Sequence, residues 1–210
     1  VNDVNEAPIM RSDYSLTINE NSPKDAAVSD VLEASDPDSD TLTYAIVDGD
    51  PDGAFKISSA DNKGTITVAR PILDFEVLPN VYKLTVTVTD DGVGFMSTSV
   101  PVTVLLTDVN EAPQFMPTTV TVPENSGVGT LVGVPLACSD VDTPATSTPL
   151  TYSIVTADMP FEVDAQSGQL SVTDASVLDH ETKSSWTFTA QCVDDHPTNP
   201  LSDTTTITVI

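Results

Sequence analysis

An internal repeat with an offset of 104 to 108 residues constrains this chain more than any other feature. The hexapeptide Asp-Val-Asn-Glu-Ala-Pro occupies residues 3–8 and again residues 108–113. When the two copies are aligned, acidic residues match as well as apolar ones. Acidic residues that served only solubility would have no reason to keep the same positions in both copies. The chain is therefore predicted to contain one domain twice, each copy about 100 residues long and able to bury its own core.

Composition excludes several classes of partner. The chain has 7 Lys and Arg residues against 32 Asp and Glu residues, a formal net charge of -25. Such a charge disfavours nucleic acid and anionic membrane surfaces. The hydrophobic fraction of 39% alternates with polar residues, which favours a folded chain over a disordered one. No apolar run reaches the roughly 18 residues of a membrane span, and the chain opens in mid-motif, so we expect a piece of a longer protein.

Short runs rich in Val, Ile, Thr and Tyr predict strands throughout. The clearest run covers residues 82–89, where apolar residues alternate with Lys83 and three threonines, so that one face is buried. In the first copy the predicted strands are residues 14–20, 27–35, 41–47, 54–58, 65–69, 82–89 and 100–106. Seven strands in about 100 residues predict an all-β fold of two tandem seven-stranded Greek-key β-sandwiches with immunoglobulin-like topology, arranged as an elongated rod.

Five short acidic motifs occur in the same order in the first copy and the linker. They are Glu20-Asn-Ser-Pro, Asp36-x-Asp38, Leu73-Asp74-x-Glu76, Asp90-x-Gly92 and Asp108-x-Asn110-Glu111-x-Pro113. This set resembles the calcium-binding signature of cadherin extracellular repeats over essentially the whole chain. The resemblance implies two tandem repeats, 9–107 and 114–210, from a larger non-classical cadherin. Residues 1–8 would be the residual linker of a preceding repeat, and 108–113 a calcium-binding linker.

The resemblance implies about three Ca²⁺ ions at the junction between the repeats. From the first repeat the implied ligands are Glu20, Asp74 and Glu76. From the linker they are Asp108, the Val109 carbonyl, Asn110, Glu111 and the Ala112 carbonyl. From the second repeat they are Asp140, Asp142 and Asp194. Calcium accepts about six to eight oxygen ligands in irregular geometry, which suits carboxylates gathered from several loops. Three divalent ions nearly neutralise these eight carboxylates, so calcium is expected to stiffen the linker.

Incomplete sites are expected at both ends. One further ion is implied at an N-terminal half-site formed by Asn5, Asp36, Asp38 and Asp90, whereas Asp3 and Glu6 lack a preceding repeat. At the other end Glu124, Asp179 and Glu181 await a following linker.

The sequence departs from the family pattern at a few positions. Glu111 stands where Asp is usual, Phe75 and His180 stand where Arg is typical, and His196 replaces a glycine, which predicts a different turn there. The N-terminal tryptophan that classical cadherins exchange in adhesion is absent. Trp186 instead alternates with apolar residues and is predicted to belong to the core.

Cys138 and Cys192 each precede a predicted ligand Asp by two residues. Both fall on the inward side of their strands, Cys138 with Val132, Val134 and Leu136. Since the second and sixth strands of such a sandwich face each other, as in the immunoglobulin inter-sheet bridge, we predict a disulfide rather than two buried thiols. A disulfide also points to an extracellular compartment.

Other motifs have plainer interpretations. The run Asp48–Gly53 opens like an EF-hand loop, but its twelfth position is Ser59 and no helices flank it, so an acidic turn is predicted. The pair Asp179 and Glu181 has the composition of a glycosidase pair, yet it recurs in a metal-ligand context. No nucleophile is set beside a base, so the chain is not expected to be an enzyme.

No N-glycosylation sequon is present. The alternating threonines, such as Thr85 and Thr204, are chiefly outward strand positions of good β propensity, and only family analogy suggests O-linked sugars on them.

The resulting hypothesis is a calcium-dependent cell adhesion module in which inter-repeat Ca²⁺ rigidifies the ectodomain of a larger cadherin. The alternative is a rigid spacer or mechanical-link stalk whose partner site lies elsewhere in the parent. The expected partners are neighbouring cadherin repeats in cis and another cadherin in trans, with no nucleic acid and no direct membrane contact. The expected location is extracellular, in the ectodomain of a single-pass cell-membrane protein.

Overall fold

The structure, a computed structural model, describes residues 2, 4–77, 79–142 and 150–210. The chain forms two compact units, Val1–Val109 and Asn110–Ile210. We call these the first and second unit. Each has its own hydrophobic core.

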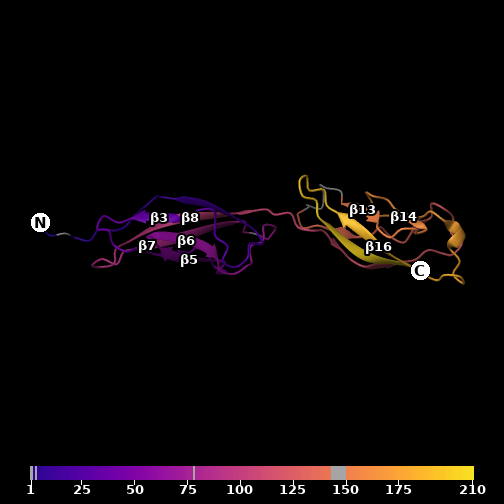
Figure 1. The fold of residues 1–210 in the computed structure, drawn as a ribbon, viewed down its shortest axis with the longest axis horizontal. Helices are drawn as coiled ribbons and strands as arrows, with labels where there is room; N and C mark the ends of the chain where they lie inside the picture. The colour runs from indigo at the N-terminus through magenta and orange to yellow at the C-terminus, as the bar shows by residue number, and fades with distance from the viewer. Residues whose placement is uncertain (1, 3, 78, 143–149) are drawn as a thin grey trace. The chain divides into compact units, whose positions relative to one another are not determined.

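The first unit is a sandwich of two four-stranded sheets (Figure 1). One sheet contains, in spatial order, β1 (Ile9–Met10), β3 (Leu32–Ser35), β6 (Lys63–Val68) and β5 (Phe55–Ala60). The other contains β2 (Tyr14–Asn19), β8 (Ser97–Thr107), β7 (Val81–Thr89) and β4 (Thr43–Asp48). The first strand thus crosses between the sheets, because β1 pairs antiparallel with β3 while β2 pairs parallel with β8.

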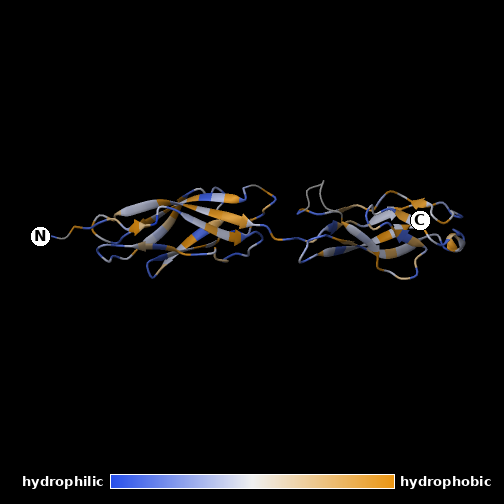
Figure 2. Ribbon diagram, turned by 90° about the horizontal axis from the view of Figure 1, so that it is seen from above, coloured by the Kyte–Doolittle hydropathy of each residue, from blue (hydrophilic) through white to orange (hydrophobic). Residues whose placement is uncertain are grey.

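Strict two-residue alternation builds the core of the first unit. In β2, Tyr14, Leu16 and Ile18 are buried and the residues between them are exposed. The same period runs through β7 and β8, which are paired along nine residues. Successive strand residues point to opposite faces of a sheet, so such alternation gives one buried and one wet face. Figure 2 shows hydrophobic residues concentrated in the strands and hydrophilic ones in the connecting loops.

The second unit repeats this architecture with shorter strands. Its longer-stranded sheet contains β10 (Thr118–Val120), β17 (Ser202–Val209), β16 (Trp186–Val193) and β13 (Thr151–Ile154). The opposite layer consists of two pieces. One is β11 (Leu131–Val132), β15 (Leu170–Val172) and β14 (Phe161–Val163), and the other is β12 (Cys138–Ser139) with β9 (Gln114–Phe115). A short 3-10 helix, η1 (Ala175–Val177), is capped by the Asp174 side chain.

Proline and glycine break two strands of the second unit. Pro117 lies between β9 and β10 and has no N–H for a ladder. Gly133, with φ of 58°, and Pro135 separate β11 from β12. A Cβ atom at Gly133 would lie 2.6 Å from Cβ of Val120, so this kink requires glycine. It also turns Val134 outward, with 70% of that residue exposed, which corrects the prediction that Val134 faces the core.

The all-β prediction is confirmed. Counting each split strand once, both units contain seven strands among the described residues. The predicted strand 27–35 is shorter than expected: Ala27 makes only an isolated bridge to Thr67, and regular pairing begins at Leu32. Residues 143–149 belong to an insertion of the second copy relative to the first, for which the sequence predicts a longer loop, and they lie outside the described residues.

Candidate metal centres

Each unit carries two groups of predicted ligands, one on the loops where the chain enters the sandwich and one at the opposite end. We call the first group the entry cluster and the second the exit cluster.

The exit cluster of the first unit is organised by Glu20, which directly follows β2 and is only 2% exposed. Its carboxylate accepts hydrogen bonds from the backbone N–H of Phe75, at 2.7 Å, and of Val109, at 2.8 Å. Its own N–H donates to the Thr107 carbonyl at 3.1 Å. Glu20 therefore holds the loop after β6 and the end of β8 together. A carboxylate oxygen of Glu76 lies within 4.8 Å of one of Glu20.

Two other predicted ligands of this end are less tightly grouped. Asp74 is exposed and accepts a hydrogen bond from the Val77 N–H at 3.0 Å, so it caps its own loop. Among the described residues it is not part of the carboxylate group that contains Glu20 and Glu76. Asp108 is exposed and directly follows β8, where the chain leaves the first unit.

The entry cluster of the second unit consists of Asn110, Glu111, Asp140, Asp142 and Asp194. The Asn110 side-chain amide donates to Asp194 Oδ2 at 2.9 Å, and the Glu111 N–H donates to Asp142 Oδ2 at 2.5 Å. The Asp142 N–H donates to Asp140 Oδ1 at 2.9 Å. Strand ends position these groups: the linker leads into β9, the two aspartates follow β12, and Asp194 follows β16.

Two further details complete this cluster. Carboxylate oxygens of Glu111 and Asp142 lie within 4.8 Å of each other. Ala112, whose carbonyl is a predicted ligand, lies two residues before β9.

The entry cluster of the first unit has the same hydrogen-bond pattern. The Asn5 side-chain amide donates to Asp90 Oδ2 at 3.2 Å, the Glu6 N–H donates to Asp38 Oδ2 at 2.8 Å, and the Asp38 N–H donates to Asp36 Oδ1 at 2.9 Å. Asp3 lies outside the described residues. Two separate segments of sequence thus adopt one oxygen-rich conformation.

Asp40 is a member of the first entry cluster that the sequence interpretation missed. Carboxylate oxygens of Asp36, Asp38 and Asp40 lie within 4.8 Å of one another. Burial raises the pKa of Asp40, and the nearby charge of Asp36 adds to the shift. The alternate-residue spacing of the three aspartates was the available signal. The matching position of the second repeat, residue 144, lies outside the described residues.

The buried aspartates Asp90 and Asp194 close the last loop of each unit. Asp90 accepts hydrogen bonds from the backbone of Gly92 and Met96. Asp194 accepts them from His196 and Leu201, so its loop is one residue longer. The contact at His196 matches that at Gly92, so the two loops differ in their length and not in this contact.

The ionisation of Asp194 follows from the same contacts. Burial raises its pKa, but the hydrogen bonds from Asn110, His196 and Leu201 outweigh burial and hold the pKa below its ordinary value. The carboxylate is therefore charged at neutral pH.

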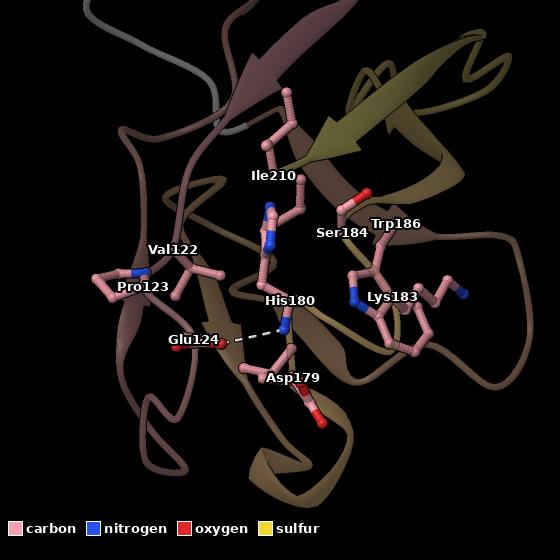
Figure 3. A pocket seen from close by; sticks show the side chains of 11 residues that line it. Val122, Pro123, Glu124, Asp179, His180, Lys183, Ser184, Trp186 and Ile210 are labelled. Atoms are coloured by element: carbon pink, nitrogen blue, oxygen red, sulfur yellow. Dashed lines mark hydrogen bonds between the residues drawn. The ribbon is translucent and has the colours of Figure 1, made fainter.

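The exit cluster of the second unit is exposed and consists of Glu124, Asp179 and Glu181, with carboxylate oxygens within 4.8 Å of one another. Figure 3 shows Glu124 accepting a hydrogen bond from the His180 N–H, at 3.2 Å. The Thr182 hydroxyl donates to Asp179 and lowers its pKa.

A pocket beside this cluster is lined partly by Val122, Pro123, Lys183 and Trp186. Lys183 Nζ lies 3.4 Å from the centre of the Trp186 ring. Trp186 is half-buried and packs against the core, in line with its predicted core role.

The predicted disulfide is present. Cys138 on β12 and Cys192 on β16 are bonded, with their Cα atoms 6.6 Å apart. Cys192 is fully buried and belongs to the core of the second unit. The bond therefore joins the two layers of this sandwich.

The donor atoms of the entry clusters suit calcium. All of them are oxygens, the donor type that hard cations such as Ca²⁺ prefer. Among the described residues, Asp36 Oδ2 and Asp142 Oδ1 are buried and have no hydrogen-bond partner. Buried carboxylate oxygens normally have partners, so these two atoms fit a metal ligand set. Asp50 differs, because both its oxygens accept backbone N–H bonds, from Ala54 and Phe55, as expected for an ordinary turn.

Together, two immunoglobulin-like sandwiches with repeated oxygen-rich ends define a class of tandem β-sandwich repeat. The family model described as "Cadherin domain" matches residues 14–107 and 118–210, and the chain therefore belongs to the cadherin family. Cadherin repeats are extracellular adhesion modules and not enzymes. Membership of the family therefore confirms the expectation that this chain is not an enzyme. Among the described residues, no helix is both long and apolar enough to span a bilayer.

Several relatives are non-classical cadherins. The chain is 36% identical to human Protocadherin-16 over 185 residues, which is 85% of this chain and 5% of that protein. It is 35% identical to the Drosophila melanogaster Protocadherin-like wing polarity protein stan over 208 residues, 93% of this chain and 6% of that protein. The chain thus spans a small fraction of the length of these relatives.

Solved structures agree with the fold. The crystal structure of Drosophila N-cadherin EC1-4 matches with a TM-score of 0.70 and 28% identity, over 98% of this chain and 49% of that one. Mouse Cadherin-23 EC22-24 matches with a TM-score of 0.69 over 98% of this chain and 66% of that one. Its 22% identity supports the fold alone.

Proposed function

We propose that this chain is a calcium-dependent cell adhesion module in which Ca²⁺ bound between its two repeats stiffens the ectodomain of a larger cadherin. The observation that carries this proposal is the recurrence of one oxygen-rich geometry. Asn110 and Asp194, and Glu111 and Asp142, repeat the contacts that Asn5, Glu6 and their partners make in the first unit.

The junction would draw ligands from both units. From the first unit these would be Glu20, Asp74, Glu76, Asp108 and the Val109 carbonyl. From the second they would be Asn110, Glu111, the Ala112 carbonyl, Asp140, Asp142 and Asp194. About three Ca²⁺ ions would supply six positive charges to eight carboxylates that otherwise repel one another. One further ion would bind at the entry cluster of the first unit, through Asn5, Asp36, Asp38, Asp90 and the added Asp40.

Small-angle scattering tests the stiffening directly. The wild type is expected to be flexible in chelator and extended with a fixed maximum dimension in calcium. Asp142→Asn removes a carboxylate of the second entry cluster and should abolish the difference. The matched control is Asp158→Asn, which also removes one charge from the second unit but in an exposed loop whose φ of 58° Asn tolerates. Identical scattering of the wild type with calcium and with chelator would refute the proposal.

The proposed partners are neighbouring cadherin repeats in cis and another cadherin in trans. The parent would be a single-pass cell-membrane protein with this segment outside the cell. Analytical ultracentrifugation and bead aggregation test the trans contact, since adhesion requires calcium-dependent self-association or capture of a partner cadherin.

The second candidate function is a rigid spacer or receptor stalk. The chain's single tryptophan favours it, because Trp186 is half-buried under Lys183 and is not placed for exchange between molecules. A spacer predicts a monomer at all calcium concentrations together with calcium-dependent stiffness. That combination would retain the calcium proposal and reject adhesion by this segment.

A further inference from the structure

We infer that the Cys138–Cys192 disulfide is a positioning device for the entry cluster of the second unit, and that it raises the calcium affinity of that cluster. This inference rests on the proposed function for the calcium and on the described contacts for the positioning. Each cysteine lies two residues before a ligand aspartate, Asp140 or Asp194. The bond therefore fixes the distance between the two strand ends from which the ligands project.

Backbone pairing alone holds this region weakly. β12 has two residues, and its ladder partner among the described residues is β9, also of two residues. Between β11 and β12, the backbone contact toward β15 in the part of the chain that the structure describes is the bond from the Leu136 N–H to the Gly168 carbonyl, at 2.9 Å. The small β9–β12 sheet nevertheless carries the chain on both sides of the cluster, from Glu111 before β9 to Asp142 after β12.

The first unit holds the same region by continuous pairing. There β3 is one unbroken four-residue strand, whose Leu32 and Glu33 pair with β6 and whose Ala34 and Ser35 pair with β1. Ala34 and Val88 stand where the second unit has the cysteines.

Where Gly133 and Pro135 interrupt the strand of the second unit, the disulfide joins it to β16 in the opposite sheet. Groups that orient metal ligands typically change metal affinity by about 10- to 100-fold when removed.

The double variant C138A/C192V, which installs the residues of the first unit, tests the inference. A calcium titration followed by NMR reads the Glu111 and Asp142 amides for the second entry cluster and the Glu6 and Asp38 amides for the first. In the variant we expect the calcium affinity read at Glu111 and Asp142 to be about tenfold weaker than in the wild type. The affinity read at Glu6 and Asp38 should be unchanged. Equal affinities at Glu111 and Asp142 in wild type and variant would overturn the inference.

Amide hydrogen exchange in chelator separates positioning from general stability and does not need calcium. Positioning predicts a larger rise in exchange at Glu111 and Asp142 than in the β16–β17 ladder, whose rise reports the overall stability lost with the disulfide. A uniform rise across the second unit indicates a purely structural bond and rejects positioning. If the wild type shows no calcium-dependent shift, the proposed function and the affinity part of the inference both fail, while exchange still decides the positioning part.

A measurement on the wild type covers the case in which the variant does not fold. Dithiothreitol reduces the bond by two electrons and two protons, giving two thiols and the cyclic disulfide of the reagent. Coupling between two binding equilibria is reciprocal. Calcium should therefore shift this equilibrium toward the protein disulfide. The factor of the shift should equal the factor by which the disulfide raises the calcium affinity. An equilibrium independent of calcium would reject the coupling.

Discussion

At the residue scale, Glu20 shows how a side chain can have a structural and a ligand role together. Its two oxygens accept hydrogen bonds from backbone groups 55 and 89 residues away in sequence. Glu124, at the same position of the second repeat, is exposed and accepts one bond at 3.2 Å. The same motif is thus a buried anchor in one unit and a surface group in the other.

Replacing Glu20 by Ala should therefore destabilise the first unit even in chelator. Two backbone N–H groups lose a charged partner, at a cost of about 2 kcal/mol or more. Glu124→Ala is the matched control and should cost about 0.5 kcal/mol, because its partner is open to water. Urea unfolding measures both, and equal costs would contradict the anchoring role.

Gly92 is the second residue whose role is specific. A Cβ atom there would lie 2.1 Å from both Asn5 Oδ1 and Asp40 Oδ2, so Gly92→Ala should displace the first entry cluster. The expected result is roughly tenfold weaker calcium binding, read at the Glu6 amide by NMR. Gly127→Ala is the control, since its added Cβ meets no described atom within 4 Å. Unchanged binding in Gly92→Ala would show that the cluster tolerates the displacement.

At the element scale, side chains connect strands that are not ladder neighbours. Tyr44 on β4 donates its hydroxyl hydrogen to the Asn62 carbonyl in the turn between β5 and β6, at 2.8 Å. A Cβ atom at Gly64 would lie 2.7 Å from the Tyr44 ring, so a glycine admits the ring at this point. Tyr152 and Gly168 lie against each other in the same way in the second unit.

Tyr44 gives an alkaline pH dependence. Burial raises its pKa to about 12 from an ordinary value of 10.0. The unfolded chain thus loses this proton first, so the stability contribution is complete below pH 10 and declines as the pH rises toward 12. Tyr44→Phe should lose less stability over this interval, measured by urea midpoints. The substitution should also remove the component of the tyrosinate absorbance titration that has a pKa of about 12. Identical pH dependence in both proteins would contradict the assignment.

The disulfide also has a stability role at this scale. Closing a loop with a sequence separation of 54 stabilises the second unit by about 4 kcal/mol through the unfolded state. Calorimetry in chelator should show C138A/C192V lowering the unfolding temperature of the second unit only. A shift in the first unit's transition would contradict independent cores.

At the scale of the whole molecule, two cores and one linker predict two unfolding transitions in chelator. Calcium that binds only to folded units should raise the temperatures of both transitions, since ligand binding to the native state stabilises that state. Asp142→Asn should reduce the calcium shift. Calorimetry at stepped calcium concentrations measures these effects, and transitions that do not respond to calcium would contradict the proposed function.

The sequence by itself determined the repeat, the strands and most of the candidate ligands. Two-residue alternation is local, so 14–20 and 82–89 correctly predicted β2 and β7. The acidic motifs could be recognised because they recur in the same order at an offset of 104 to 108 residues. The disulfide was predicted from the inward parity of both cysteines together with the facing positions of the second and sixth strands in such a sandwich.

Only the tertiary structure decided how these residues meet. It brought Asp40 into the first entry cluster, left Asp74 capping its own loop, and turned Val134 outward at the Gly133 kink. It also buried Glu20 under backbone groups far away in the sequence. The physical reason is range: strand periodicity is a property of neighbouring residues, whereas a ligand cluster depends on loops closing together from strands that pair across the whole domain.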